Sequence, residues 1–121
     1  MAISTVHLEK VGTTFAHLWD ARNLDVIGPL YHEDATFISP NPPNFSSDFG
    51  TTLVGRDEIL RYFRTVLDVI PPGAATTVAL LTGINMVVWV WQGGESKGAD
   101  VMLFDDDGLI VRHHVTAPES A

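Results

Sequence analysis

The sequence contains no cysteine. This absence excludes disulfide bonds, catalysis by a thiolate and metal sites built on cysteine, and it is typical of a reducing compartment, so we expect a cytoplasmic protein. The N-terminus has no apolar run of signal-peptide length. The longest apolar region, residues 78–91, is interrupted by Thr82, Gly83 and Asn85, so we expect no membrane-spanning segment.

Basic residues are also scarce. Lysine and arginine number 7 against 15 aspartates and glutamates, which gives a formal net charge of −8 and makes nucleic acid an unfavourable partner. Hydrophobic residues make up 45% of the chain and charged residues 18%, a balance typical of globular proteins. A chain of 121 residues is long enough for one core, so we expect a single domain over residues 1–121.

The hydrophobic periodicity predicts helices followed by strands. Helical spacing is found at residues 5–21, 24–31 and 55–70, and strand-like alternation at 35–39, 75–81, 86–92, 98–103 and 109–116. The last four strands are joined by short polar turns, which indicates an antiparallel meander. The predicted fold class is therefore α+β, with helices packed on one face of a curved antiparallel sheet.

The one long loop, residues 41–52, is rich in proline and serine and carries Phe45 and Phe49. Two interpretations remain open for these aromatic residues. They anchor the loop to the body of the protein, or they belong to a lid over a binding site.

The last hairpin, residues 98–116, contains the sharpest chemical feature. A four-residue turn at 105–108 would place Phe104 opposite Leu109 and therefore Asp100 opposite His113, on the same face of the sheet. A similar turn at residues 93–96 would place Trp89 opposite Asp100. We therefore predict a row across three strands, and alternation adds to its face Val87, Trp91, Met102, Phe104, Val111 and Val115.

An Asp–His pair in apolar surroundings has three interpretations that the sequence leaves open. Asp100 could orient His113 as an acid or base. It could instead stay protonated and donate a hydrogen bond to a developing oxyanion, because desolvation favours the neutral acid. The pair could also simply tie two strands together. His114 points to the opposite face and no third ligand is evident, so we expect no metal site.

The order of elements, together with the segments LYHEDATFISP (30–40), GRDEILRYF (55–63) and DDDGLI (105–110), resembles the NTF2-like superfamily. The resemblance is to its SnoaL-like polyketide cyclase and ketosteroid isomerase branch. It implies a cone-shaped, cystatin-like fold whose curved sheet leaves an apolar pocket for a small hydrophobic molecule. It also implies a homodimer packed through the outer sheet face. Family activities include isomerisation, cyclisation, dehydration and epoxide hydrolysis, and many members have no known activity.

The same resemblance assigns roles to individual positions. The isomerase's general base falls on Ser39, its oxyanion-hole tyrosine on Phe15 and a supporting tyrosine on Phe63, whereas its second oxyanion-hole residue, an aspartic acid, falls on Asp100. His113 falls on an apolar pocket-lining position. Ketosteroid isomerisation by the family mechanism is therefore not expected, and Asp100 is the residue that carries over.

We accordingly predict Asp100 and His113 as catalytic residues, with His113 as base or acid and Asp100 as its partner or as an oxyanion donor. The residues predicted to bind substrate are Phe15, Trp19, Tyr31, Ser39, Phe63, Trp89, Trp91 and Met102. Two functions fit. One is an enzyme without a cofactor that isomerises, cyclises or dehydrates a hydrophobic carbonyl compound. The other is a non-catalytic module that binds a hydrophobic ligand or dimerises.

Overall fold

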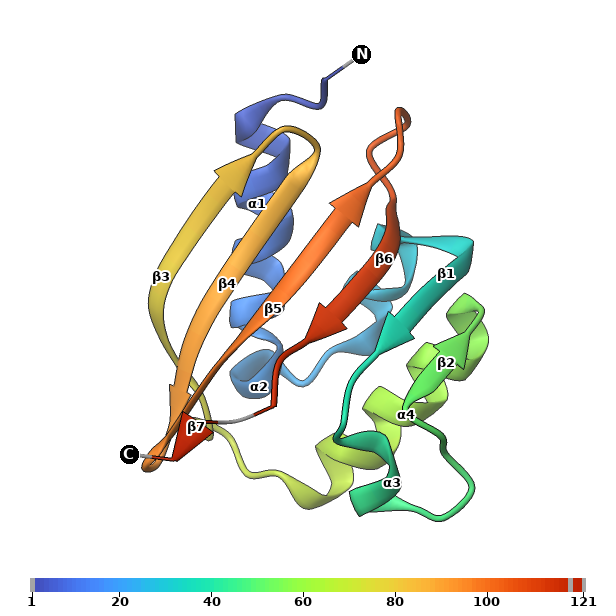
Figure 1. The fold of residues 1–121 in the computed structure, drawn as a ribbon, viewed down its shortest axis with the longest axis vertical. Helices are drawn as coiled ribbons and strands as arrows, with labels where there is room; N and C mark the ends of the chain where they lie inside the picture. The colour runs from blue at the N-terminus through green and yellow to red at the C-terminus, as the bar shows by residue number, and fades with distance from the viewer. Residues whose placement is uncertain (1, 118, 121) are drawn as a thin grey trace.

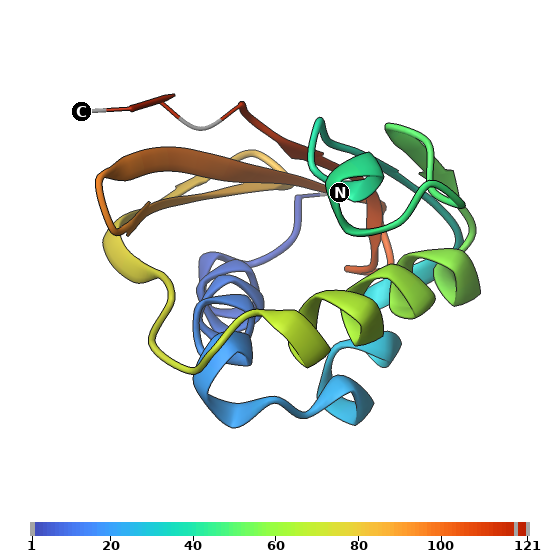
Figure 2. The ribbon, with the colours of Figure 1, turned by 90° about the horizontal axis from the view of Figure 1, so that it is seen from below.

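The structure is a computed structural model that describes residues 2–117 and 119–120, without the side chains of Trp19, Glu119 and Ser120. One curved sheet carries helices on its concave face (Figures 1 and 2). The helical elements are α1 (Thr5–Ala16), α2 (Leu18–Ala21), η1 (Leu24–Val26), η2 (Gly28–Leu30), α3 (Pro42–Phe45) and α4 (Arg56–Val69). The strands are β1 (Tyr31–Ile38), β2 (Thr52–Val54), β3 (Thr76–Gly83), β4 (Met86–Gly93), β5 (Ser96–Phe104), β6 (Ile110–Val115) and β7 (Glu119–Ser120).

The sheet has the order β2-β1-β6-β5-β4-β3, with β7 pairing β5 at its side. The meander β3 to β6 is antiparallel, as predicted, but β1 and β6 pair in parallel, so the sheet is mixed. A parallel pair needs a long crossover, and the segment from α3 to β5 provides it (Figure 1). The non-local pairing with β6 makes β1 longer than the strand predicted at residues 35–39, because its first residue, Tyr31, pairs with Ile110.

The helix predicted at residues 55–70 is found as α4. The two other segments predicted as helices, residues 5–21 and 24–31, differ from their predictions. Residues 5–21 form two helices separated by a turn at His17, and only α1 has a side-chain cap, in which the Ser4 hydroxyl accepts the His7 backbone N–H at 3.2 Å. The segment 24–31 forms two single 3₁₀ turns. Pro29 lacks the N–H that a continuous α-helix would need there. Arg22, which follows α2, then connects α2 with α4 by donating to the carbonyls of Leu67 and Ile70 at the end of α4.

The register of the β4–β5 hairpin is as predicted, with Trp89 opposite Asp100 and Gln92 opposite Lys97. The turn itself is tighter, because Gly93 and Ser96 already pair and Gly94 takes the positive φ of 60° that a tight hairpin requires.

The register predicted for the β5–β6 hairpin is wrong: Asp100 lies opposite Val115, and His113 lies opposite Met102. The turn accounts for one residue of this shift, because Phe104 pairs with Ile110 instead of Leu109, and the Asp105 N–H donates to the Leu109 carbonyl at 2.9 Å. A β-bulge near Phe104, which pairs with Ile110, shifts the register by one more. The total shift is two residues, so His113 stays on the same face as Asp100.

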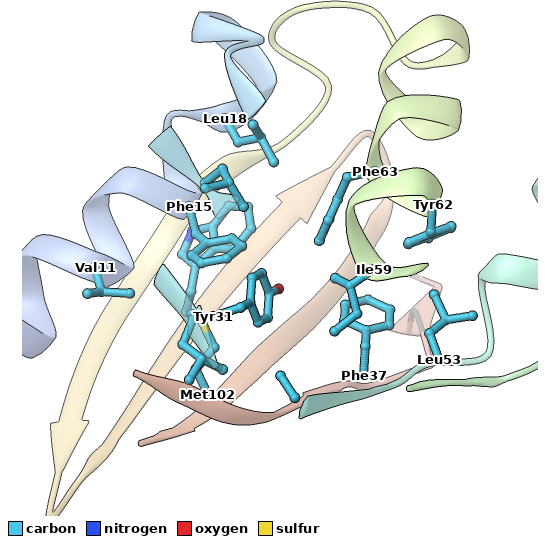
Figure 3. Packing of buried hydrophobic residues seen from close by; sticks show 14 of the residues in the cluster. Val11, Phe15, Leu18, Tyr31, Phe37, Leu53, Ile59, Tyr62, Phe63 and Met102 are labelled. Atoms are coloured by element: carbon cyan, nitrogen blue, oxygen red, sulfur yellow. The ribbon is translucent and has the colours of Figure 1, made fainter. Parts of the chain in front are cut away.

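The bulge also changes which residues face the core. Ile110 is fully buried, whereas Val111, which was predicted to share the face of Asp100, is only half-buried. The inner sheet face packs against α1 and α4, and their facing side chains form the core (Figure 3). Gly12 allows α1 to approach β3 closely, because a Cβ there would lie 2.7 Å from the side chain of Leu80. Within the described residues, no helix is long and apolar enough to cross a membrane.

Helix α1 offers a matched test of this packing. Val11 is 2% exposed and Val6 is 76% exposed on the same helix. Val11→Ala should lower the free energy of unfolding by about 2 kcal/mol, from the lost burial of two methyl groups and the space left behind. Val6→Ala should change it by less than about 0.5 kcal/mol. Urea unfolding of both variants measures the difference, and equal losses would mean that α1 does not pack as described.

Candidate functional site

Four side chains from four strands form one hydrogen-bonded chain. The Tyr31 hydroxyl lies 2.6 Å from Nδ1 of His113, and Nε2 of His113 lies 2.7 Å from Oδ2 of Asp100. The other carboxylate oxygen, Oδ1, accepts the indole N–H of Trp91 at 2.9 Å. Tyr31 and His113 are fully buried and Asp100 is 8% exposed, so this chain of hydrogen bonds runs outward from the core.

The sheet brings these residues together. The parallel pairing of β1 with β6 places Tyr31 beside the strand that carries His113, and Asp100 and His113 are diagonal neighbours across β5 and β6. Trp91 lies opposite Gly98 on β5. A Cβ at Gly98 would lie 2.4 Å from the Trp91 ring, so only glycine lets the indole lie over β5 and reach Asp100.

The hydrogen-bond partners assign the protons along the chain. Burial, and then the negative charge of Asp100, raise the pKa of Tyr31 well above its usual value, so Tyr31 stays protonated and its hydroxyl donates a hydrogen bond to Nδ1 of His113. With Nδ1 accepting from Tyr31, the ring proton lies on Nε2 and is donated in a hydrogen bond to Asp100. Asp100 accepts from His113 and Trp91 at once, which is the arrangement of an ionised carboxylate.

Asp100 lies in the wall of a cavity of about 360 Å³. The cavity is lined by residues of α3, α4 and the sheet. Its aromatic lining consists of Phe37, Phe45, Tyr62, Phe63, Trp89 and Trp91. Its aliphatic lining consists of Val66, Ile70, Ala74, Ala75 and Val115, and its other polar lining consists of Asn41, Asn44 and Asp100. The single acidic side chain of this lining is therefore surrounded by flat apolar surfaces.

The structure separates the residues predicted for the site into two sets. Phe63, Trp89, Trp91 and Asp100 line the cavity, whereas Phe15, Tyr31, Ser39, Met102 and His113 do not. The predicted site residue Trp19 has its side chain outside the described part of the structure.

All five residues of the second set are buried, and none of them lines the cavity. His113 is fully buried behind Asp100, and Phe15 packs edge-on against its ring with centroids 5.3 Å apart. Met102 lies opposite His113 and is also fully buried. The Ser39 hydroxyl accepts the Asn41 backbone N–H at 3.1 Å and thus fixes the start of α3.

The sequence interpretation missed Tyr62 and the contribution of α3. A signal for Tyr62 was present, because Ile59, Tyr62, Phe63 and Val66 follow the i, i+3, i+4, i+7 spacing of one helix face. For α3 the signal was Phe45 in a loop rich in proline and serine. Its ring lies 5.9 Å from that of Tyr62, so the segment both packs on α4 and lines the cavity. Among the described residues, no three His, Asp or Glu side chains are grouped so that they could hold a metal ion.

The hydrogen bond between Tyr31 and His113 should be measurable in stability. Tyr31→Phe leaves Nδ1 of His113 buried without a donor, which should lower the free energy of unfolding by about 1–3 kcal/mol. Tyr62→Phe is the matched control, since the Tyr62 hydroxyl makes no hydrogen bond with any described residue and its loss should be neutral or slightly stabilising. Urea unfolding compares the two; an equal effect would contradict the assigned chain.

The comparisons with known proteins agree with this architecture. The family model described as a SnoaL-like domain matches residues 13–113. No curated protein sequence matches the chain significantly. A SnoaL-like protein of unknown function from Burkholderia thailandensis has a similar crystal structure, with 21% identity, coverage of 98% of this chain and 99% of its own, and a TM-score of 0.81.

Two further solved structures are similar. A protein of unknown function with a cystatin-like fold, from Methylobium petroleophilum, is 20% identical, covers 100% of this chain and 81% of its own, and has a TM-score of 0.76. A steroid delta-isomerase from Pseudomonas aeruginosa is 25% identical, covers 96% of this chain and 82% of its own, and has a TM-score of 0.69. With a family model matched over most of its length and this fold, the chain belongs to the SnoaL-like domain family.

Proposed function

We propose that this protein is an enzyme that moves a proton next to the carbonyl group of a small, largely apolar molecule, with Asp100 as the catalytic base. The observation that carries the proposal is the position of the Asp100 carboxylate, in the wall of an otherwise apolar, aromatic cavity. A carboxylate that is shielded from water and held by neighbouring donors is suited to general base catalysis.

This proposal reverses the roles expected from the sequence. His113 is fully buried and separated from the cavity by Asp100, so a ligand in the cavity meets the carboxylate and not the imidazole. His113 is a positioning residue: its N–H fixes Oδ2 of Asp100, while the Trp91 N–H fixes Oδ1. Each oxygen keeps a second lone pair for the proton of a substrate.

The proposed reaction begins with the C–H bond beside the carbonyl. Asp100 takes the proton, the C–H electron pair forms a carbon–carbon double bond, and the carbonyl oxygen gains the negative charge of an enolate. Return of the proton from Asp100 to a different carbon isomerises the substrate. Loss of a neighbouring hydroxyl, which takes the proton from Asp100 and leaves as water, dehydrates it. Attack of the enolate carbon on a second carbonyl, whose oxygen takes the proton from Asp100, cyclises it. All three outcomes share the first step.

A binding module without turnover is the alternative. It is favoured by the departures from the isomerase pattern at Phe15, Ser39 and Phe63, which the resemblance aligns with that enzyme's polar groups. The same cavity would then hold a small hydrophobic molecule without transforming it. A measurement that separates binding from proton transfer distinguishes the two functions.

Exchange of the α-protons of a ketone in deuterium oxide is such a measurement, and NMR follows it. We expect the wild-type protein to catalyse the exchange of deuterium into the α-position of β-tetralone, or of a β,γ-unsaturated ketosteroid suggested by the Pseudomonas aeruginosa relative. Asp100→Asn should lower kcat/KM by roughly 10²–10⁴-fold, since general base catalysis is lost, while ketone binding should change little.

Asp68→Asn on the exposed face of α4 is the control and should behave as wild type. Unchanged exchange in Asp100→Asn would remove Asp100 as the base. Binding of both ketones without exchange in the wild type would favour the binding module.

A further inference from the structure

Asp100 brings a negative charge into the cavity, and both of its hydrogen-bond partners are neutral groups. The carboxylate is 8% exposed and accepts from the ring of His113 and the indole of Trp91. The His113 ring holds a single proton, because its other nitrogen accepts from Tyr31. Neutral donors orient the carboxylate but leave its net charge in poorly solvated surroundings, which costs free energy unless a positive charge lies nearby.

The remainder of the lining supplies no such positive charge. Among the described residues that line the cavity, none is a lysine, an arginine or a histidine. The guanidinium of Arg22 donates to carbonyls at the end of α4, and that of Arg61, on the exposed face of this helix, pairs with Glu58 at 2.9 Å. The chain as a whole has a formal net charge of −8, which attracts cations and repels anions. A ligand that complements this cavity therefore carries a positive charge.

The aromatic rings of the lining favour an alkylated cation. These rings belong to Phe37, Phe45, Tyr62, Phe63, Trp89 and Trp91. Figure 3 shows Tyr62 and Phe63 on α4 close to Phe37 of the sheet, and the ring of Phe37 lies 5.4 Å from that of Tyr62 and 5.6 Å from that of Phe63. Aromatic faces attract cations, most strongly when the site is shielded from water and the ring is tryptophan. An ammonium ion covered with alkyl groups meets such rings with little loss of hydration.

The acceptors of the lining limit how many N–H groups this ion can carry. A primary ammonium ion has three N–H donors, and each of them needs an acceptor once it is buried. Asp100 keeps a second lone pair on each oxygen, whereas the amides of Asn41 and Asn44 lie nearer the surface, half-buried and exposed. A tertiary ammonium ion has one N–H, which Asp100 alone can accept.

We infer that the cavity is a binding site for a tertiary alkylammonium ion, a protonated amine whose single N–H donates to Asp100 and whose alkyl groups lie against the aromatic rings. A cavity of about 360 Å³ is large enough for such an ion with one small ring attached. This inference goes beyond the proposed function and requires no reaction. The amine should also inhibit the proposed proton transfer, because amine and ketone would compete for the same carboxylate.

The test compares two ligands of the same shape on the wild-type protein. N,N-dimethylbenzylamine is protonated at neutral pH, and isobutylbenzene has a C–H group where the amine has its N–H. NMR titration of the Trp91 indole signal follows the binding of each. We expect the amine to bind at least as tightly as the hydrocarbon, although water solvates the amine far better. Benzylamine, with three N–H donors, should bind roughly fivefold or more weakly than the tertiary amine.

A matched pair of variants tests the contact with Asp100. Asp100→Asn replaces the carboxylate by a neutral amide of the same size. It should weaken binding of the tertiary amine roughly 10- to 100-fold, as for the loss of a hydrogen bond between charged groups, and leave isobutylbenzene binding within about twofold. Asp68→Asn, on the exposed face of α4, removes the same charge from the protein and should leave the binding of both ligands unchanged.

Several results would overturn the inference. They are failure of the tertiary amine to bind, tighter binding of isobutylbenzene or of benzylamine, unchanged amine affinity in Asp100→Asn, and an equal loss of affinity in the two variants. Isobutylbenzene binding verifies that Asp100→Asn is folded, and the comparison of ligands on the wild type needs no variant. Ketone exchange without amine binding would leave the proposed function intact. Amine binding without exchange would support this site and overturn the proposed reaction.

Discussion

The hydrogen bond between Nε2 of His113 and Oδ2 of Asp100 is the interaction on which the rest of the site depends. It connects the buried side of the sheet with the cavity. Behind it, the fully buried Tyr31 hydroxyl leaves His113 one proton to give, and this proton goes to Asp100. In front of it, the indole of Trp91, which can lie over Gly98 because that residue has no side chain, holds the second carboxylate oxygen. The carboxylate is thus fixed in position and charge at an apolar wall.

Much of this arrangement could be predicted from residues that are close in sequence. The meander and its β4–β5 register follow from alternation and short turns, and both are found in the structure. The β5–β6 register was wrong by two residues, because the turn and a bulge each shift it by one. An even shift keeps every side chain on its face, so Asp100 and His113 still meet, as diagonal rather than direct neighbours. A shift of one residue would have separated them.

Features that depend on distant parts of the chain could not be predicted in this way. The parallel pairing of β1 with β6 joins Tyr31 to Ile110, and nothing in the local sequence around Tyr31 indicates that its hydroxyl would meet His113. The same pairing converts the predicted end of a helix into the start of a strand. Whether an inward-facing side chain reaches the cavity also depends on distant parts of the chain. Phe15, Met102 and His113 face inward as expected, yet other side chains cover them. Alternation predicts the face of a residue but not whether a ligand can reach it.

The two tyrosines summarise how burial and function are related here. Tyr31 has its partner within the protein and serves the structure of the site, whereas Tyr62 lines the cavity. The roles of both tyrosines depend on the charge state of the Asp100–His113 pair. The central claim is that Asp100 is ionised and that His113 carries one proton, on Nε2. NMR of ¹⁵N-labelled histidine in the wild-type protein at neutral pH measures it directly. We predict a neutral His113 that is protonated at Nε2 alone. A doubly protonated ring, or a proton at Nδ1 alone, would contradict the account.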